Sequence, residues 1–307
     1  MIKLHFKKYR TAPPTTCEFY RIGRVLGKGA FGKVSLAMHK LVEQLVAIKS
    51  MSKETLQCEV DQRRRTKLEM GILAQCNHPN VVRLFDTFET TKHICFVIEL
   101  CSGGDLFSYI KKRRRLKEDV ARFFFKQLVE GLAYIHNAKK VVHRDIKLEN
   151  ILLDATGNVK ICDFGVSRQL KTGLEKMKEQ CGTPAYIAPE ILLDKGYTGF
   201  KVDMWSAGVC LYAMLIGSVP FKASTMDKLQ SLIIKGEYDF KFQTNANSKQ
   251  MNNPKAATTL LSTEVQDLIS RLLQTDPEKR LSAIESLQHP WLQEGDPNLD
   301  VYTDKEK

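Results

Sequence analysis

Residues 143–150, with the sequence HRDIKLEN, constrain this chain most, because its fold must hold three different functional groups at fixed offsets. Asp145 contributes a carboxylate, Lys147 an ammonium and Asn150 an amide. The string matches the pattern HRDxKxxN, and a chance match somewhere in a chain of this length has odds of about one in ten thousand. The set suits phosphoryl transfer onto a hydroxyl: Asp145 would orient the acceptor and take its proton, and Lys147 would stabilise the transferred charge.

A β-hairpin is expected directly after this loop. Two short apolar runs between Ile151 and Ile161 flank the string DATGN, whose residues favour a turn. The hairpin would fold Asn150 back toward Asp163, the first residue of a DFG string. Amide and carboxylate oxygens are hard ligands of the kind that Mg²⁺ prefers, so this pair predicts a metal site. The alternative is a set of solvated loop charges that never converge.

A glycine-rich string, GKGAFGKV, occupies residues 27–34. Glycines of this spacing let backbone amides approach phosphates, but a dinucleotide-binding fold uses a similar string. In that fold a helix opens here, whereas Val34, Leu36 and Met38 alternate with smaller residues, which is typical of a half-buried strand. The pattern therefore favours a flap over nucleotide phosphates.

Lys49 ends the string VAIK on a predicted strand, where it could neutralise the inner phosphates of a nucleotide. A lysine in that position needs an anionic partner. Glu69 is the better candidate because it lies on a predicted helix at 62–75, and Glu59 is the second. The alternative is an exposed surface pair that contributes little.

The chain changes character near Leu100. Before it, apolar runs of strand length at 45–48 and 94–98 accompany the one helix. After it, long helices dominate, and one has an apolar stripe that recurs every four residues and predicts a core-facing helix, namely Val120, Phe124, Leu128 and Leu132.

Three further segments of the second half have distinct patterns. Ser102 and Asp105 have the spacing of a capping box that opens a helix. The polar segment 242–259 predicts a surface insertion, and the acidic, polar residues after Leu292 predict a tail.

The composition is that of an ordinary folded protein, with 43% hydrophobic and 27% charged residues, and 307 residues suffice for two lobes that each bury a core. No apolar stretch approaches the roughly 18 residues of a membrane span, and the N-terminus lacks the apolar core of a secretory signal. The eight cysteines form no CxxC pair, which argues against a zinc site or a disulfide framework and for a reducing, intracellular compartment. The expected location is the cytoplasm, with the nucleus as the alternative.

The formal net charge is +12, and basic residues cluster at 63–65 and 111–115. Such runs could bind nucleic acid, acidic lipid or a phosphate, or direct nuclear import. The alternative is that each is a solvated helix face. No aromatic residue is interleaved with either run, so a stacking platform for single-stranded nucleic acid is not indicated.

These motifs, in this order, make residues 19–292 resemble the eukaryotic protein kinases. The APE string at 188–190 and the DMW string at 203–205 extend the match. In such kinases the glutamate of APE pairs with an arginine, here Arg280.

Other strings narrow the resemblance within that family. Lys147 and the GTPAY string at 182–186 resemble serine/threonine rather than tyrosine kinases. The strings CSGGDLF at 101–107 and HPW at 289–291 are similar to the calmodulin-dependent and AMP-activated kinase group.

The resemblance implies an α+β, bilobal protein kinase fold with a small, mainly β N-lobe and a larger, mainly α C-lobe. The implied boundaries are an N-terminal extension at 1–18, the N-lobe at 19–100, the C-lobe at 101–293 and a C-terminal tail at 294–307.

ATP and Mg²⁺ are the implied cosubstrate and cofactor. The implied catalytic residues are Asp145, Lys147, Lys49 and Glu69, and the implied metal ligands are Asn150 and Asp163. The nucleotide would contact Leu26, Gly27, Gly29, Gly32, Val34, Ala47, Lys49, Glu99, Cys101 and Asp105. Ile98 would be the gatekeeper beside the hinge. Cys162 would line the nucleotide site, although a small buried hydrophobe without special reactivity is the simpler interpretation.

An arginine placed as Arg144 is, beside the catalytic aspartate, implies a pocket for an anion from the activation loop, commonly a phosphate. The position that often carries the phosphorylated threonine is Glu179 here. We therefore hypothesise that Glu179 partly replaces the phosphate. Thr172 and Ser167 are alternative sites for an upstream kinase.

Protein substrates with a basic residue upstream of the target hydroxyl are the expected partners. Asp105 and Glu149 resemble acidic positions that favour an upstream arginine, whereas Ala213 stands where strongly basophilic kinases have a second glutamate.

Three other functions compete with this one. A catalytically inactive binding module is disfavoured because Lys49, Asp145, Asn150 and Asp163 are all present. A small-molecule phosphotransferase would share an HxDxxxxN string but would not be expected to carry APE. Nucleic-acid binding through the basic runs would be non-specific if moderate salt abolished it.

Overall fold

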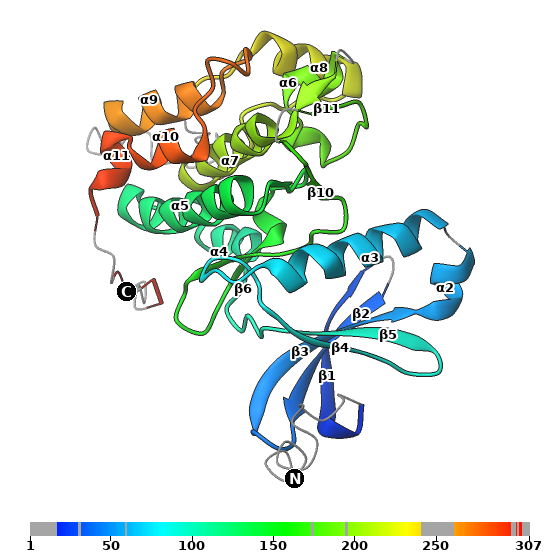
Figure 1. The fold of residues 1–307 in the computed structure, drawn as a ribbon. Coiled ribbons are helices and arrows are strands. Elements are labelled where there is room, and N and C mark those ends of the chain that lie inside the picture. Colours follow the sequence, from blue (N-terminus) through cyan, green and yellow to red (C-terminus); the bar gives the residue numbers. More distant parts are fainter. Residues whose placement is uncertain are drawn as a thin grey trace. The chain divides into compact units, whose positions relative to one another are not determined.

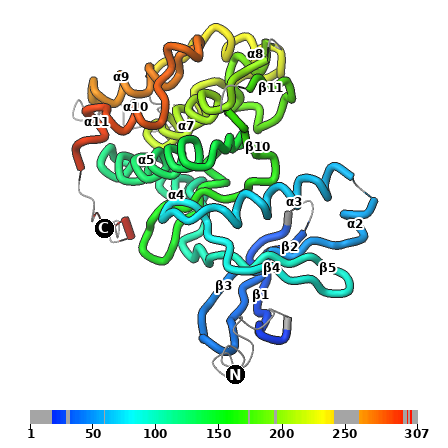
Figure 2. The backbone as a smooth tube through the Cα atoms, viewed as in Figure 1, coloured from blue at the N-terminus to red at the C-terminus, as the bar shows by residue number. Residues whose placement is uncertain are grey.

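The computed structural model describes residues 17–29, 32–58, 60–172, 175–193, 196–240, 261–295, 299, 301 and 302. Within these residues the chain folds into two compact units, and Figure 1 and Figure 2 trace each of them. Unit 1 comprises the chain up to Asn77 together with Val82–Cys101. Unit 2 comprises His78–Val81 and the chain from Ser102 onward.

Unit 1 is built around an antiparallel sheet with the strand order β1-β2-β3-β5-β4 (Figure 1). Its strands are β1 (Tyr20–Gly29), β2 (Gly32–His39), β3 (Gln44–Ser52), β4 (Leu84–Glu89) and β5 (His93–Ile98). Its helices are η1 (Cys17–Phe19), α2 (Lys53–Cys58) and α3 (Val60–Gln75). The predicted strands at 45–48 and 94–98 and the predicted helix at 62–75 are confirmed.

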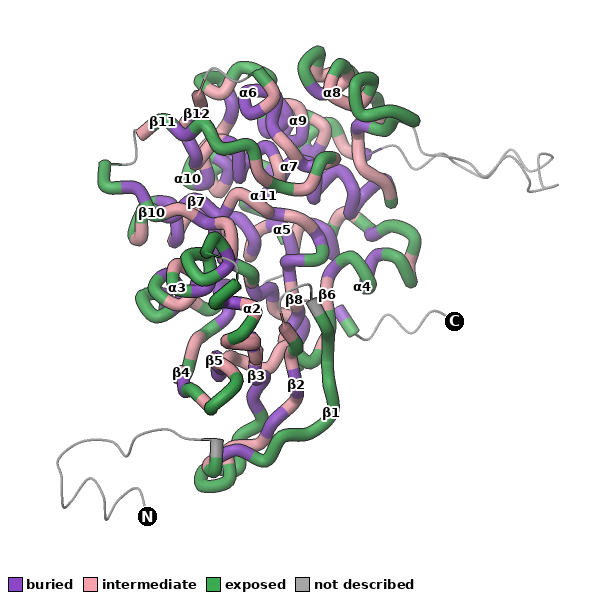
Figure 3. The backbone as a smooth tube through the Cα atoms, turned by 90° about the vertical axis from the view of Figure 1, so that its right-hand side faces the viewer, coloured by how far each residue is buried: buried purple, intermediate pink, exposed green. Residues whose placement is uncertain are grey.

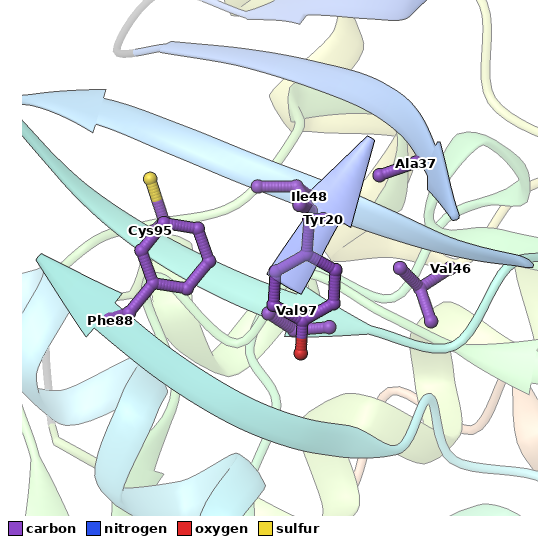
Figure 4. Packing of buried hydrophobic residues seen from close by; sticks show 7 residues of the cluster. All are labelled: Tyr20, Ala37, Val46, Ile48, Phe88, Cys95 and Val97. Carbon is purple, nitrogen blue, oxygen red and sulfur yellow. The ribbon is translucent and has the colours of Figure 1, made fainter. Parts of the chain in front are cut away.

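One face of this sheet carries a hydrophobic cluster (Figure 4). The cluster consists of Tyr20, Ala37, Val46, Ile48, Phe88, Cys95 and Val97. The rings of Tyr20 and Phe88 stack with their centroids 5.6 Å apart. Burying these apolar surfaces stabilises unit 1 by removing them from water.

The strand predicted at 34–38 is present as part of β2, but its buried face is not the apolar one. Ser35 and Ala37 are 3% and 1% exposed, whereas Val34, Leu36 and Met38 are half-buried. Large side chains from neighbouring strands already fill the core face, so only small side chains fit there. The larger apolar side chains of β2 therefore lie on the opposite face of the sheet.

Unit 2 is mainly helical. Its longer helices are α4 (Leu106–Arg113), α5 (Glu118–Ala133), α7 (Gly199–Ile216), α8 (Met226–Lys235) and α9 (Thr263–Leu272). Shorter helical segments are η2 (Tyr134–Ala138), η3 (Leu148–Asn150), η4 (Pro184–Tyr186), α6 (Pro189–Leu192), α10 (Ala283–Leu287) and α11 (Pro290–Gln293). The strands are β6 (Gly104–Asp105), β7 (Val141–Val142), β8 (Ile151–Leu153), β9 (Val159–Ile161), β10 (Arg168–Gln169), β11 (Lys176–Met177) and β12 (Tyr197–Thr198).

Helices α5 and α7 form the centre of this unit, and Figure 3 shows buried residues concentrated along both. The predicted stripe of α5 is confirmed, because Val120 is 7% exposed and Phe124, Leu128 and Leu132 are fully buried. By length and composition α7 could cross a membrane, which the sequence analysis did not anticipate. Most of α7 is buried inside unit 2, as the core helix of a folded unit would be.

The predicted hairpin after the catalytic loop is confirmed as β8 and β9, with Ile151 paired to Ile161. The start of the next predicted helix is corrected. Asp105, rather than Ser102, is the N-cap of α4, and its carboxylate accepts the backbone N–H of Ser108 at 2.7 Å. A carboxylate in this position satisfies one of the free N–H groups of the first turn.

The expected polar tail is also corrected in part. Val301 is only 2% exposed, and its carbonyl oxygen accepts the hydroxyl of Tyr109 at 2.6 Å. The insertion predicted at 242–259 lies outside the described residues. Both basic runs lie largely on exposed positions, at 63–65 on α3 and at the end of α4.

Candidate functional site

The glycine-rich string forms the turn between β1 and β2. Gly27 pairs with Val34, and Gly29 pairs with Gly32, so the two strands continue to the tip of the hairpin. A Cβ at Gly32 would collide with the backbone of Ser50 on β3, which explains one of the glycines. A Cβ at Gly27 would meet no atom within 4 Å, so that backbone is open to a ligand.

Four candidate residues of unit 1 share one face of its sheet. Val34 pairs with Lys49 across β2 and β3, and Ala47 pairs with Ile98 across β3 and β5. Since paired residues lie on the same face and alternate along each strand, all four lie opposite the hydrophobic cluster. Leu26 lies in β1 between Val25 and Gly27, where the pairing with β2 is irregular, and is 43% exposed.

Lys49 forms the expected ion pair with Glu69. The Nζ atom lies 2.6 Å from Oε1 and 2.8 Å from Oε2 of Glu69. The Glu69 side chain is 6% exposed, so this is not the exposed surface pair that was the alternative. Glu59, the other candidate, lies outside the described residues. The contact fixes the ammonium of Lys49 between strand β3 and helix α3.

The segment after β5 contains the expected hinge residues. The backbone N–H of Glu99 donates to the carbonyl of Arg83 at 2.9 Å, and the N–H of Arg83 donates to the Glu99 carboxylate at 3.2 Å. Cys101 is half-buried and ends unit 1. Asp105 follows in unit 2 as the helix cap already described, where its Oδ2 also accepts the Ser108 hydroxyl at 2.9 Å.

Unit 2 holds its catalytic loop through Asp203 of α7. The Asp203 carboxylate accepts the backbone N–H groups of His143 and Arg144, each at 2.8 Å. His136 lies 2.8 Å from the same carboxylate, which is 1% exposed. Arg144 has a φ of 69°, a conformation that costs energy for a side chain other than glycine. The buried carboxylate thus fixes the backbone just before Asp145.

Asp145, Lys147 and Thr183 form a closed triangle of polar contacts. The Lys147 ammonium lies 2.7 Å from Oδ2 of Asp145 and donates to the Thr183 hydroxyl at 2.9 Å. That hydroxyl donates to Oδ1 of Asp145 at 2.9 Å. Thr183 was noted in the sequence only as part of the GTPAY string. Its contact with the loop joins residues 36 and 38 positions apart, and no local pattern signals it.

Asn150 and Asp163 meet through the hairpin. The backbone N–H of Cys162 donates to the carbonyl of Asn150 at 3.0 Å, which brings the adjacent Asp163 beside Asn150. The side-chain nitrogen of Asn150 donates to the carbonyl and to Oδ2 of Asp145, at 2.9 and 3.0 Å. The amide oxygen is then the atom of Asn150 suited to a cation, and Asp163 is exposed with a φ of 65°.

Two hard oxygen donors held side by side fit Mg²⁺, which usually keeps waters or phosphate oxygens as its other ligands. Across the described part of the chain, no group of three or more His, Cys, Asp or Glu side chains could hold a metal ion. The neighbouring Cys162 is half-buried, and its thiol donates to the Asn150 carbonyl at 3.3 Å.

Glu179 lies between two arginines. Its carboxylate is 3.0 Å from the Arg168 guanidinium and 3.5 Å from that of Arg144. Burial raises the pKa of Glu179, but a backbone hydrogen bond and the charges of Arg168 and Arg144 outweigh it and hold the pKa below its ordinary value. The Glu179 carbonyl also accepts the hydroxyl of Tyr197 at 2.8 Å.

The two alternative modification sites differ in access. Ser167 is fully buried, and its hydroxyl donates to the carbonyl of His143 at 3.1 Å. A modifying enzyme therefore has no access to Ser167 in this structure, which argues against that expectation. Thr172 is exposed, and its backbone N–H donates to Glu175 at 3.1 Å.

The expected pair of Glu190 and Arg280 is confirmed. The Arg280 guanidinium donates to both carboxylate oxygens of Glu190, at 2.6 and 2.9 Å, in the two-bond geometry that makes such pairs strong. Its Nη1 also donates to the backbone carbonyl of Lys201, its Nε donates to that of Gln274, and the Arg280 side chain is fully buried. This pair ties α6 to the segment before α10.

A family model described as "Protein kinase domain" matches residues 20–292. The chain belongs to the protein kinase family. It is 40% identical to the maternal embryonic leucine zipper kinase of Xenopus tropicalis over 91% of this chain and 40% of that protein. It is 40% identical to the serine/threonine protein kinase OSK3 of Oryza sativa subsp. indica, over 89% of this chain and 50% of that protein.

A third kinase, the CBL-interacting serine/threonine-protein kinase 12 of Arabidopsis thaliana, is 39% identical over 94% of this chain and 55% of its own length. This kinase chain thus spans about half the length of the curated relatives it matches. The predicted fold class and the resemblance to calmodulin-dependent and AMP-activated kinases are confirmed.

Proposed function

We propose that this kinase transfers the γ-phosphoryl group of ATP to serine and threonine hydroxyls of protein substrates. The observation that carries the proposal is the contact of Asp145, Lys147 and Thr183 within 2.7 to 2.9 Å of one another. A carboxylate, an ammonium and a hydroxyl in one place can receive an acceptor hydroxyl, take its proton and stabilise the transferred charge. The family match and the names of two relatives support the serine/threonine class.

In the proposed reaction the substrate hydroxyl oxygen forms a bond to the γ-phosphorus, and the bond from that phosphorus to the β–γ bridging oxygen breaks to release ADP. Asp145 accepts the hydroxyl proton. Lys147, 2.7 Å from Asp145, stabilises negative charge on the transferred group. Lys49, held by Glu69, would neutralise the inner phosphates.

Asn150 and Asp163 would hold Mg²⁺, which would neutralise phosphate charge when bound. The chain itself orients the two proposed ligands. The Asn150 side-chain nitrogen is engaged by Asp145, and the hairpin sets the position of Asp163. Removing the Asn150 amide would disturb both the cation ligand and the position of the base.

A preference for basic residues upstream of the target hydroxyl is part of the proposal. Glu149 is exposed and Asp105 is half-buried, and both are acidic groups of unit 2. Ala213, in contrast, is 5% exposed within α7 and offers no charge. A peptide library assayed with magnesium and ATP should show enrichment of Arg or Lys upstream, and no enrichment would contradict this preference.

We also propose that Glu179 partly substitutes for an activation-loop phosphate. Its contacts with Arg144 and Arg168 support this, because Arg144 directly precedes Asp145 and its Nε donates to the carbonyl of Val166 at 2.6 Å. An anion at this position would order the segment around the catalytic loop without an upstream kinase. The alternative is phosphorylation of Thr172.

The decisive experiment compares wild-type and Asp145→Asn enzyme, purified unphosphorylated, on the same peptide library. We expect phosphoryl transfer only from the wild type, and full activity of Asp145→Asn would overturn the mechanism. Glu179→Ala should lower the activity of the unphosphorylated enzyme several-fold, whereas the exposed neighbour Gln180→Ala serves as the matched control. Unchanged activity in Glu179→Ala would show that the carboxylate is only a solvated loop charge.

A further inference from the structure

Two residues near the C-terminus, Val301 and Tyr302, are fastened to unit 2; we call this pair the C-terminal clasp. Val301 is 2% exposed, and its carbonyl oxygen accepts the hydroxyl of Tyr109 at 2.6 Å. Tyr109 lies on α4 and is itself fixed, because its ring packs edge-on against Phe124 of α5 with centroids 5.2 Å apart. The clasp is therefore attached to the helix that Asp105 caps.

The Tyr302 side chain contacts two separate turns, one at Gly103 and one at Asp154. Its hydroxyl donates to the carbonyl of Asp154, in the β8–β9 turn, at 2.9 Å. The same hydroxyl lies against Gly103, where a Cβ would collide with it. A Cβ at Gly157 would likewise collide with a methyl of Val301. Two glycines of the chain thus make room for the two clasp residues.

The segments that the clasp contacts are those that position Asp105. The backbone N–H of Gly103 donates to the carbonyl of Leu153 at 2.9 Å, and Asp105 pairs with Leu152 across β6 and β8. The Asp105 carboxylate is held in turn by Ser108 at the start of α4. Strand β8 and helix α4 therefore fix Asp105 together, and the clasp contacts both helix α4 and the turn that follows β8.

We propose that Val301 and Tyr302 are positioning residues that set Asp105 for binding of ATP. The inference rests on the proposed function, in which the chain binds ATP, and on the family resemblance, which implies that Asp105 contacts the nucleotide. Loss of the clasp should therefore weaken ATP binding. The hydrogen bonds of the clasp within the described residues do not include Asp145, Lys147 or Thr183, so the rate at saturating ATP should be nearly unchanged. Affinity for a peptide without basic residues upstream of the target hydroxyl should also be unchanged, because Asp105 is proposed to interact only with such upstream basic residues of a peptide.

The experiment uses the full chain and four variants. Tyr302→Phe removes only the hydroxyl, Tyr302→Ala removes the ring as well, and Tyr109→Phe removes the donor to Val301. The matched control is Tyr212→Phe, which removes a comparable hydroxyl bond, 2.7 Å long, to the carbonyl of Asp239. Binding of MgATP is measured by calorimetry, which requires no phosphoryl acceptor, together with KM for ATP, KM for peptide and kcat.

We expect Kd for MgATP to rise about threefold in Tyr302→Phe and Tyr109→Phe, each of which loses one hydrogen bond. In Tyr302→Ala we expect a rise of about tenfold, because the packing of the ring is lost as well. KM for ATP should rise in parallel, with kcat and KM for a peptide without upstream basic residues within about twofold of the wild type. Tyr212→Phe should leave Kd unchanged. An unchanged Kd in Tyr302→Ala, or an equal loss in Tyr212→Phe, would overturn the proposal.

Amide hydrogen exchange tests the positioning of Asp105 without depending on the proposed phosphoryl transfer. In Tyr302→Ala the amides of Gly103 and Asp105 should exchange faster than in the wild type, while those of α9 should not. If the wild type bound ATP but phosphorylated no peptide, the proposed function would fail and the binding test of the clasp would stand. If the wild type bound no ATP, both would fail.

Discussion

The hydroxyl of Thr183 donates to the carboxylate of Asp145 at 2.9 Å, across 38 residues of sequence. The same hydroxyl accepts from Lys147 at 2.9 Å, so Thr183 holds the proposed base and the proposed charge stabiliser in one arrangement. Without it, the Lys147 ammonium would still lie near Asp145, but each of the two side chains would lose its contact with the hydroxyl.

Thr183→Ala should therefore lower kcat about 10-fold to 100-fold, because small misplacements of catalytic groups have costs of this size. Thr183→Ser retains the hydroxyl and should recover most of the rate. The measurement is steady-state transfer to one serine peptide at saturating ATP. Equal rates for Thr183→Ala and Thr183→Ser would show that the hydroxyl has no part in catalysis.

Variants of the pair of Lys49 and Glu69 should show that its effects on activity and on stability are distinct. Lys49→Met removes a positive charge from the nucleotide phosphates and should lower kcat/KM about 100-fold to 1000-fold. It also leaves the buried Glu69 without its cation, which should lower the free energy of unfolding by about 1–3 kcal/mol. Denaturant titration and steady-state kinetics measure the two effects.

The double variant Lys49→Met/Glu69→Leu is the control. It removes both charges, so its free energy of unfolding should return toward that of the wild type while activity stays low. A double variant less stable than Lys49→Met alone would refute the explanation that the buried Glu69 carboxylate destabilises the variant once Lys49 is lost.

Much of the site was predictable because it depends on short strings. The hairpin between Asn150 and Asp163 follows from a turn string and two apolar runs, and Lys49 and Glu69 follow from a strand and a helix in sequence. Such features depend on local spacing, which a sequence displays directly. The pair of Glu190 and Arg280 required the family resemblance, since 90 residues separate them.

The remaining features depend on packing between distant segments. Thr183, the three contacts of Asp203 and the burial of Val301 are set by how helices and loops meet, and no periodicity encodes them. The buried face of β2 was missed for the same reason. Ser35 lies in the core because bulky neighbours leave only a small space, which the pattern of that strand does not show.

The buried pair of Arg280 and Glu190 should be essential for stability. Arg280→Met leaves the Glu190 carboxylate buried without a cation, which should lower the free energy of unfolding by about 3–5 kcal/mol. Arg280→Lys should be intermediate, because an ammonium cannot make the two parallel bonds. Thermal unfolding of the three proteins tests this order, and a lysine variant as stable as the wild type would contradict it.

The stability of unit 2 should depend on pH through Glu118. Its carboxylate accepts the backbone N–H and the hydroxyl of Ser262, each at 2.7 Å, and the indole N–H of Trp291 at 3.1 Å. Burial raises the pKa of Glu118, but these hydrogen bonds outweigh it and hold the pKa below its ordinary value of 4.5. The folded state therefore binds this proton less readily than the unfolded state, so the stabilisation is complete above pH 4.5 and is lost as pH falls through the folded-state pKa.

Glu118→Gln keeps the shape of the side chain and removes the charge. At pH 7 it should lower the free energy of unfolding by about 1–2 kcal/mol, since hydrogen bonds to a charged group are stronger than neutral ones. The difference from the wild type should shrink below pH 4.5, where the wild-type carboxylate takes up its proton. Denaturant titrations at several pH values provide the measurement, with the exposed Glu264→Gln as control. A difference that stayed constant down to complete protonation would show that Glu118 acts through its shape and not through its charge.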